Sequence, residues 1–283
     1  MKQATATLLI ICPDRPGLVA AVSNFLFERG ANIVHADQHV DREEGLFLQR
    51  VEFEAEGLDL DALEANFGGL AGPMGMRWAL RRSTRDAQVA ILVSQQAHCL
   101  TDLLARWEMK ELSGHPVAVI SNHPDHADLV GHFGLPYHHL PVDPESRADQ
   151  EAKVLETLES VGADLIVLAR YMQVLSGDFV ERYPNRIINI HHSFLPAFAG
   201  GRPYHQAHER GVKVIGATAH YVTAELDQGP IIDQDVTRIS HRDSVSDLVQ
   251  KGRDLEKVVL ARAVRAHLEN QILVYRNRTV VFA

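Results

Sequence analysis

The sequence has few of the features that mark secreted or membrane proteins. It contains only two cysteines, Cys12 and Cys99, which lie far apart and form no Cys-x-x-Cys pair. A disulfide framework is therefore not expected, and a reducing compartment fits. No apolar run approaches the ~20 residues that a membrane helix needs, and the first run, which ends before Asp14, is too short for a signal peptide. We expect a cytoplasmic protein without a membrane partner.

The chain also lacks an excess of basic residues. Lysine and arginine total 28, against 37 aspartates and glutamates, which gives a formal net charge of −9. Because an acidic surface repels phosphate backbones, nucleic acid is not expected as a partner.

Complete metal-binding signatures are missing, although the chain has 16 histidines. His205 and His208 lie three residues apart and could join His191, His192 and His220 in a zinc site. No His-Glu-x-x-His or Cys-x-x-Cys pattern completes such a site, so we expect no bound metal.

Two regions with different patterns make up the chain. Residues 1–82 are predicted to run strand, helix, strand, strand, helix, strand, which is the order of a ferredoxin-like unit. From residue 88 onward, continuous apolar strands alternate with helices, which is typical of a mainly parallel, Rossmann-like sheet covered on both faces. The polar stretch 83–87 predicts a linker. The sequence therefore predicts an α/β protein with domains at 1–82 and 88–283.

The end of the second region departs from strict alternation. "KVIGATAHYV" and "PIIDQDVTRI" predict an antiparallel pair of strands. A long amphipathic helix is predicted over 243–269, and two further strands at "QILVYR" and "RTVVF".

The predicted strand "RIINI" runs into polar side chains that a packing strand does not need. Because side chains alternate along a strand, Asn189 and His191 share one face, roughly 7 Å apart. They stand at the carboxyl end of a parallel strand, where open α/β sheets place their ligand crevices. A turn-capping asparagine and a half-buried histidine would explain each residue singly. The pair at one strand end favours a functional site.

A later loop, "AELDQGPII", contains the acid that this pair lacks. Taken alone, Asp227 would be interpreted as a turn aspartate that bonds its own backbone. It becomes a candidate for the site only because the pair of Asn189 and His191 lacks an acid.

The turn "SQQAHC", after the strand "QVAILVS", contains no glycine. Turns that cradle phosphate groups carry several, so we expect no phosphate-binding role there.

These motifs resemble a known family. "RIINIHHSFLPAFAGGRPYHQAHERGVKVIGATAHYVTAELDQGPII" resembles the folate-dependent formyltransferases, and nearly all of 88–283 is most similar to their deformylase branch. The family pattern is Asn-x-His, then Ser-x-Leu-Pro, then an Asp before Gly-Pro. The resemblance implies that the catalytic residues are Asn189, His191 and Asp227. The segment "LARYMQVLS" resembles the one that lines the pteridine pocket, which implies that the folate-binding residues are Tyr171, Met172, Gln173 and Leu175.

The first region resembles an ACT domain, at "DRPGLVAAVSNFLFERGANI". ACT domains often pair edge to edge and bind amino acids at that seam. The resemblance therefore implies a homo-oligomer and an amino-acid effector, whose identity and sign of action stay open.

The resemblance implies a hydrolase that acts on a formamide C–N bond. Its reaction would convert 10-formyltetrahydrofolate to tetrahydrofolate and formate, balancing one-carbon folate pools and supplying formate for purine synthesis. No cofactor is expected beyond the folate substrate. The glycinamide ribonucleotide transformylases carry a glycine-rich turn after the first strand, which "SQQAHC" replaces, and His192 stands where the family often has proline. Both differences favour water over an amine as acceptor.

Three alternatives stay open: formyl transfer to an amine, an amino-acid sensor without enzymatic activity, and a metal hydrolase. The role of Asp227 is also open, either as a base on water or as the group that holds His191 charged.

Overall fold

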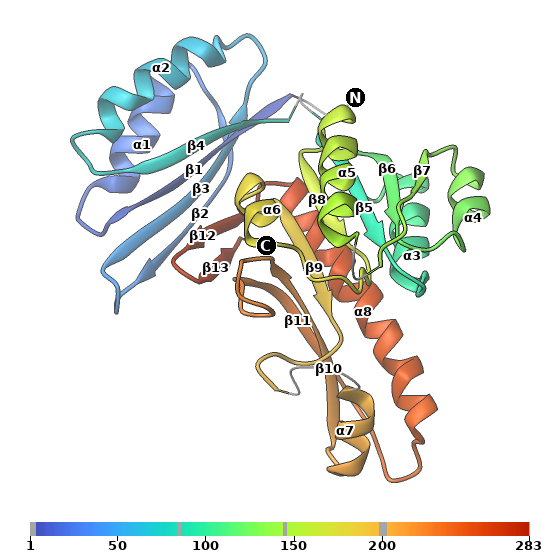
Figure 1. The fold of residues 1–283 in the computed structure, drawn as a ribbon. Coiled ribbons are helices and arrows are strands. Elements are labelled where there is room, and N and C mark those ends of the chain that lie inside the picture. Colours follow the sequence, from blue (N-terminus) through green and yellow to red (C-terminus); the bar gives the residue numbers. More distant parts are fainter. Residues whose placement is uncertain (1–3, 84–85, 144–145, 198–202, 283) are drawn as a thin grey trace. The chain divides into compact units, whose positions relative to one another are not determined.

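The computed structural model describes residues 4–83, 86–143, 146–197 and 203–282 (Figure 1). The chain forms two compact units. The first comprises the chain up to Asp86, residues Asn270–Tyr275 and the chain from Thr279 onward. The second comprises Ala87–Glu269 and Arg276–Arg278.

The first unit is a four-stranded antiparallel sheet with two helices on one face. The strands lie in the order β2-β3-β1-β4. Together with the chain order of helices and strands, this confirms the predicted ferredoxin-like fold. The elements are β1 (Thr5–Pro13), α1 (Leu18–Phe27), β2 (Ile33–Asp41), β3 (Leu46–Glu54), α2 (Leu60–Ala71) and β4 (Arg77–Arg82).

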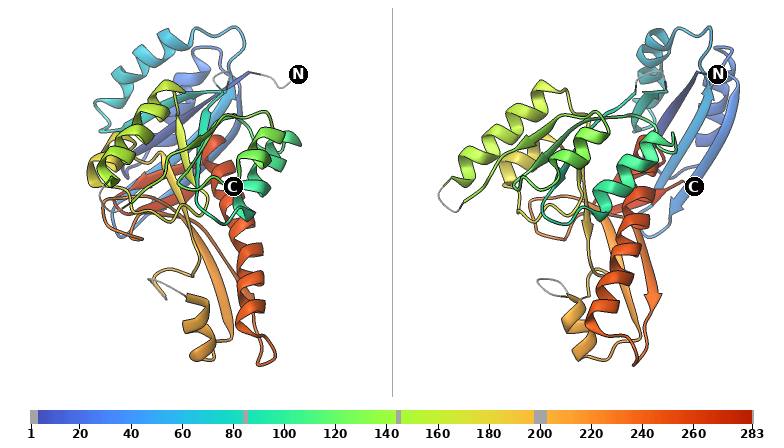
Figure 2. Two further views of the ribbon diagram at one scale, coloured as in Figure 1. Left: turned by 45° about the vertical axis from the view of Figure 1, so that its right-hand side comes forward. Right: turned by 90° about the vertical axis from the view of Figure 1, so that its right-hand side faces the viewer.

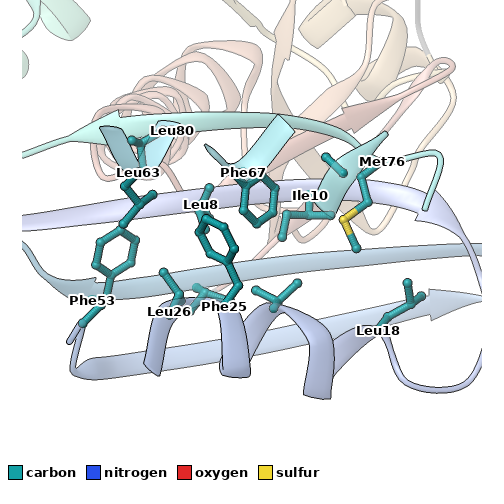
Figure 3. Packing of buried hydrophobic residues seen from close by; sticks show 14 of the residues in the cluster. Leu8, Ile10, Leu18, Phe25, Leu26, Phe53, Leu63, Phe67, Met76 and Leu80 are labelled. Carbon is teal, nitrogen blue, oxygen red and sulfur yellow. The ribbon is translucent and has the colours of Figure 1, made fainter. Parts of the chain in front are cut away.

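The apolar run of β1 follows from burial on both faces of the sheet. Leu8 and Ile10 point toward the helices and pack with Phe25, Phe53 and Phe67 (Figure 3). The residues between them, which face the other way, are buried as well. Because a strand with two covered faces loses the alternation of apolar and polar residues, the sequence of β1 is continuously apolar.

A C-terminal hairpin covers the second face of this sheet. It consists of β12 (Ile272–Tyr275) and β13 (Arg278–Val281). Its apolar side chains pack against β1 and β3, in a cluster made of Leu9, Ile11, Leu48, Leu273, Tyr275 and Phe282. The Tyr275 hydroxyl donates to Asp41 Oδ2 at 3.0 Å, and Arg50 Nε donates to the Asn270 carbonyl at 3.0 Å.

The observed division therefore differs from the predicted one at the C-terminus. The sequence assigned all of 88–283 to one domain, but β12 and all of β13 except Arg278 belong to the first unit, where they cover the apolar second face of its sheet. In the predicted linker 83–87, residues 84 and 85 lie outside the described residues. The second unit begins at Ala87.

The second unit contains a seven-stranded sheet with helices on both faces (Figure 2). Its strand order is β11-β10-β9-β8-β5-β6-β7, parallel from β7 to β9 and antiparallel from β9 to β11. The predicted Rossmann-like sheet and the antiparallel pair after it are confirmed. The strands are β5 (Gln88–Val93), β6 (His115–Ser121), β7 (Tyr137–His139), β8 (Leu165–Leu168), β9 (Ile187–His191), β10 (Val214–Tyr221) and β11 (Ile231–Arg238).

The helices of the second unit divide between the two faces of its sheet. Buried residues of α5 and α6 pack on one face, and α8 lies along the other, where it contacts α3, α7, β9, β10 and β11. A capping box of Ser244 and Asp247 starts α8. No helix in the described ranges is long and apolar enough to cross a membrane. The helices are α3 (His98–Glu108), α4 (Ala127–His132), α5 (Arg147–Ser160), α6 (Gly177–Arg182), α7 (Pro203–Glu209) and α8 (Val245–Leu268).

The role of the hairpin can be tested by stability. Leu273→Ala should lower the free energy of unfolding of the first unit by about 2–5 kcal/mol, because Leu273 is buried against β1 and β3. Urea denaturation can be followed by the fluorescence of Trp78, which lies in β4. A Trp107→Phe background removes the other of the two tryptophans.

The matched control is Val281→Ala, because Val281 is an exposed residue of the same hairpin. It should cost less than about 1 kcal/mol. Equal losses for the two variants, or no loss for Leu273→Ala, would show that the hairpin does not stabilise this unit.

Candidate active site

The ends of β9 and β10 and the loop between β10 and β11 bring four polar side chains together. His191 Nδ1 lies 3.3 Å from Asp227 Oδ1. Asn189 Nδ2 lies 3.3 Å from His220 Nε2, and His220 Nε2 lies 3.8 Å from Asp227 Oδ1. The structure therefore places the three sequence-predicted catalytic residues in one group and adds His220, which the sequence considered only as part of a zinc site.

The loop geometry explains how Asp227 reaches β9. The Tyr221 N–H donates to the Pro230 carbonyl at 2.9 Å, which closes the loop at its base. At Gly229 a Cβ atom would lie 1.7 Å from the Tyr221 carbonyl oxygen, so only glycine permits this approach. Asp227 itself has φ 56°, a left-handed conformation that aspartate tolerates better than most residues. The sequence "DQGP" thus turns the carboxylate back toward the sheet.

Backbone contacts set the tautomer of His220. Its Nδ1 lies 2.9 Å from the Tyr221 carbonyl, which can only accept, so Nδ1 carries the proton. Burial lowers the pKa of His220, which keeps the ring neutral near pH 7. Nε2 then accepts from the Asn189 amide. An amide has two N–H groups, so one N–H of Asn189 remains to donate elsewhere.

The electrostatics of the pair keep Asp227 ionised. The hydrogen bond from His191 lowers the pKa of Asp227, and burial opposes this only in part. Across the His191 ring, Nε2 is buried and makes no hydrogen bond to any described residue. A buried ring nitrogen without a partner costs about 1–3 kcal/mol, which is typical of a group kept for a ligand.

His192 is held uncharged beside this group. Its ring lies 5.1 Å from that of His191 and 6.1 Å from that of Tyr204, between centroids. Burial, together with the charge of Arg170, lowers the pKa of His192 to about 4. At neutral pH it therefore does not compete with His191 for the charge of Asp227.

The four predicted folate-binding residues lie in the segment after β8, in different environments. Tyr171 is buried, and its hydroxyl accepts from Gln150 Nε2 at 3.0 Å. Tyr171, Gln173 and Leu175 line one pocket together with residues of α5. Met172 is 60% exposed, and its N–H donates to Ser94 Oγ at 3.0 Å. The segment thus offers two exposed apolar side chains, Met172 and Val174, beside a partly polar pocket.

The histidines that the sequence considered for a zinc site lie in different environments. His205 and His208 are both exposed on α7. Among the residues that the structure describes, the only group with metal-like spacing is His98, Cys99 and Glu256.

Sequence reasoning missed Glu256, although a signal was present. The buried face of α8 is apolar at Leu248, Val259 and Leu260, and Glu256 lies on the same face. A lone acid in an apolar helical stripe indicates a buried ion pair or a functional group.

The comparisons with known proteins agree with this fold. Residues 87–264 match the formyl transferase family and residues 6–65 match the ACT domain. Fold and site thus define a formyl transferase-class protein with an ACT domain.

Relatives narrow this class. The formyltetrahydrofolate deformylase of Synechocystis sp. is 54% identical over 100% of both chains, and that of Bacillus subtilis is 50% identical over 97% of this chain and 93% of its own. The crystal structure of a formyltetrahydrofolate deformylase from Pseudomonas syringae pv. tomato has a TM-score of 0.97 at 48% identity, covering 100% of this chain and 96% of that one. The chain belongs to the formyltetrahydrofolate deformylase family, which confirms the resemblance.

Structures of transformylases are less similar. Glycinamide ribonucleotide transformylase 1 from Symbiobacterium toebii has a TM-score of 0.66 at 32% identity and covers 70% of this chain and 95% of its own.

The hydrogen bond between His191 and Asp227 predicts a pH-dependent stability. Because the pKa of Asp227 is lower in the folded than in the unfolded chain, its carboxylate stabilises the fold at neutral pH. That contribution is lost as pH falls through the folded-state pKa, below the usual value near 4. Asp227→Asn should therefore be less stable than wild type at pH 7 and should match it in strong acid. Urea unfolding followed by Trp107, in a Trp78→Phe background, measures this difference.

Glu209→Gln is the matched control, because it removes one charge at an exposed position of α7. It should stay within about 0.5 kcal/mol of wild type at every pH. A loss of stability for Asp227→Asn that does not change with pH would show that the Asp227 carboxylate does not stabilise the fold.

Proposed function

We propose that Asn189, His191 and Asp227 catalyse the hydrolysis of 10-formyltetrahydrofolate to tetrahydrofolate and formate. Full-length relatives at 54% and 50% identity that are named formyltetrahydrofolate deformylase support the reaction. The residue roles depend on one observation: an ionised carboxylate lies 3.3 Å from Nδ1 of His191, while Nε2 of the same ring is unpartnered among the described residues.

The reaction needs one proton to move. Water attacks the formyl carbon, the carbonyl oxygen becomes an oxyanion, and the C–N bond to the folate nitrogen then breaks. His191 Nε2 can take the proton from water and deliver it to the leaving nitrogen, a transfer typically worth 10²–10⁴-fold. The formic acid that is released ionises to formate in solution.

Asp227 and Asn189 act at different steps of this reaction. Facing Nδ1, Asp227 orients the His191 ring and stabilises the imidazolium that forms when Nε2 takes the proton. This geometry favours the orienting role for Asp227 over direct proton removal from water. The second N–H of Asn189 is available to the oxyanion, and one such donor is typically worth ~3 kcal/mol of barrier.

The segment after β8 is proposed to hold the folate. Met172 offers an exposed apolar side chain that can contact the pteridine ring. Tyr171, Gln173 and Leu175 belong to the same segment, whose backbone groups can read the polar edge of the ring. No cofactor beyond the folate substrate is needed in this scheme, and the formate can feed purine synthesis in the cytoplasm.

The ACT unit is proposed to carry regulation. Its match to the ACT domain supports a small amino acid as effector. Strand β2 lies at one edge of the sheet and is mostly exposed, which supports edge-to-edge pairing with a second copy of the chain.

Formate release without an acceptor tests the function. Incubation of the full chain with 10-formyltetrahydrofolate alone should produce formate and tetrahydrofolate at a steady rate, because water is the acceptor. Formate can be measured with a coupled dehydrogenase. Release that requires an added amine would support transfer instead, and no release in either case would contradict a formyl-folate enzyme.

Substitutions test the residue roles. Asp227→Asn should lower kcat by about 10²–10⁴-fold, because the neutral amide no longer stabilises the imidazolium. Asn189→Ala should lower it by about 10²–10³-fold through loss of an oxyanion donor. Both should bind tetrahydrofolate as wild type does, which fluorescence titration can check.

Glu225→Gln provides the control, because Glu225 is an exposed acid in the same loop as Asp227. Its kcat should stay within about two-fold of wild type. Deformylation retained by Asp227→Asn would remove Asp227 from the scheme.

A further inference from the structure

A second cluster of charged side chains lies beside the proposed site, and the proposed reaction does not use it. Glu256 of α8 is only 1% exposed. Its Oε2 accepts a hydrogen bond from His98 Nε2 at 2.7 Å, and its Oε1 accepts from the Tyr204 hydroxyl at 2.6 Å. Arg170 Nε lies 3.5 Å from Oε2. Three elements far apart in the sequence thus converge on one buried carboxylate.

This cluster is not suited to a metal ion. His98, Cys99 and Glu256 place ligand atoms within 4.8 Å of one another. However, protein donors already occupy both oxygens of Glu256, and the guanidinium of Arg170 would repel a cation. Burial raises the pKa of Cys99 well above its usual value, so its sulfur is a thiol rather than the thiolate that a metal prefers. The carboxylate therefore serves the side chains around it.

One of those side chains shapes the proposed folate-binding segment. Arg170 follows β8 and has φ 65°, a left-handed conformation that costs a non-glycine residue about 1–3 kcal/mol. Such a conformation persists only where its surroundings hold it. The Arg170 carbonyl accepts from the Ser94 N–H at 3.2 Å, and the buried guanidinium faces Glu256 as an ion pair, although its Nε makes no hydrogen bond to a described residue. Residues 171–175 continue directly from this anchored position.

Another partner stands beside the proposed catalytic histidine. Tyr204 of α7 is buried, and its ring lies 6.1 Å from that of His192, which neighbours His191 in the chain. The Tyr204 hydroxyl donates to Glu256, so a series of contacts runs from the carboxylate through Tyr204 and His192 to the end of β9.

The helix is built to allow this contact. Gly252 lies one turn before Glu256 on α8, and a Cβ atom there would lie 2.0 Å from the Tyr204 hydroxyl oxygen. Glycine inside a helix costs about 1 kcal/mol relative to alanine. The close approach of Tyr204 to α8 therefore requires a residue that the helix itself disfavours, and this observation is independent of the charges.

We propose that Glu256 is a positioning residue for deformylation: it holds the folate-binding segment through Arg170 and the His191 side of the site through Tyr204. The proposal depends on the proposed function. Glu256 does not touch the substrate. It sets the distance between the segment that binds folate and the histidine that acts on the formyl group. A misplacement of 1 Å between such groups can cost about 10²-fold in rate.

Steady-state kinetics of formate release can separate the contact of Glu256 with Tyr204 from its contact with Arg170. Tyr204→Phe removes only the bond to Glu256 and should lower kcat about ten-fold with KM within two-fold of wild type. Arg170→Lys weakens the contact between residue 170 and Glu256. It should raise KM several-fold, because the folate-binding segment is then held less firmly. Glu256→Ala should show both effects, with kcat lowered by about 10²-fold. Glu256→Gln keeps a hydrogen-bond acceptor for Tyr204 and should recover most of kcat but not KM.

Controls distinguish positioning from folding. Asp254→Asn alters an exposed acid of the same helix that pairs with Lys257, and it should match wild type in kcat and KM. Gly252→Ala displaces Tyr204 without changing the carboxylate and should reproduce the kcat effect of Tyr204→Phe. If Glu256→Ala does not fold, the Tyr204→Phe, Arg170→Lys and Gly252→Ala variants decide the question.

The outcomes separate the two proposals. Formate release by wild type with unchanged kinetics in these variants, or a loss of active protein at constant KM in all of them, would overturn the positioning role alone. No formate release by wild type would overturn the proposed function and the positioning role together.

Discussion

The contact between Gly229 and the Tyr221 carbonyl is the constraint on which the site depends. It closes the loop after β10 so tightly that Asp227, two residues earlier, returns to the end of β9. Sheet geometry positions His191, because a parallel strand directs its last side chains into the crevice at its carboxyl end. The contact between His191 and Asp227 is therefore the product of one regular strand and one tight loop, and only the loop depends on a single residue type.

The fold was predictable where the sequence showed both the spacing of the apolar residues and the element that buries them. The βαββαβ order and the parallel sheet followed from local periodicity. Strand β1 showed apolar residues on both faces, which required a second covering layer but did not identify it. That layer is the C-terminal hairpin, more than 250 residues away in the chain. Sequence periodicity shows that a face is buried, and only three-dimensional structure shows what buries it.

The residues of the site could be predicted from the sequence to different degrees. Asn189 and His191 were paired by strand alternation alone, whereas Asp227 was selected through the family resemblance because a turn aspartate is common. His220 was missed as a partner of Asn189 because the two residues meet only through the pairing of β10 with β9, where His220 stands opposite Asn189. The spacing of side chains along one strand does not show which residue of a neighbouring strand lies opposite.

The completeness of hydrogen bonding separates the roles of the two buried acids. Glu256 has donors on both oxygens and a guanidinium beside it, and these together outweigh the burial that would raise its pKa. A carboxylate whose two oxygens already accept hydrogen bonds from the protein is poorly able to bind a substrate. Its role is therefore to position the side chains around it. Asp227 instead faces a histidine whose far nitrogen has no partner among the described residues. A reacting group needs an atom that is free to bond with the substrate and is held in a fixed direction, and His191 Nε2 meets both conditions. For this reason we place the chemistry at His191 rather than at the cluster around Glu256.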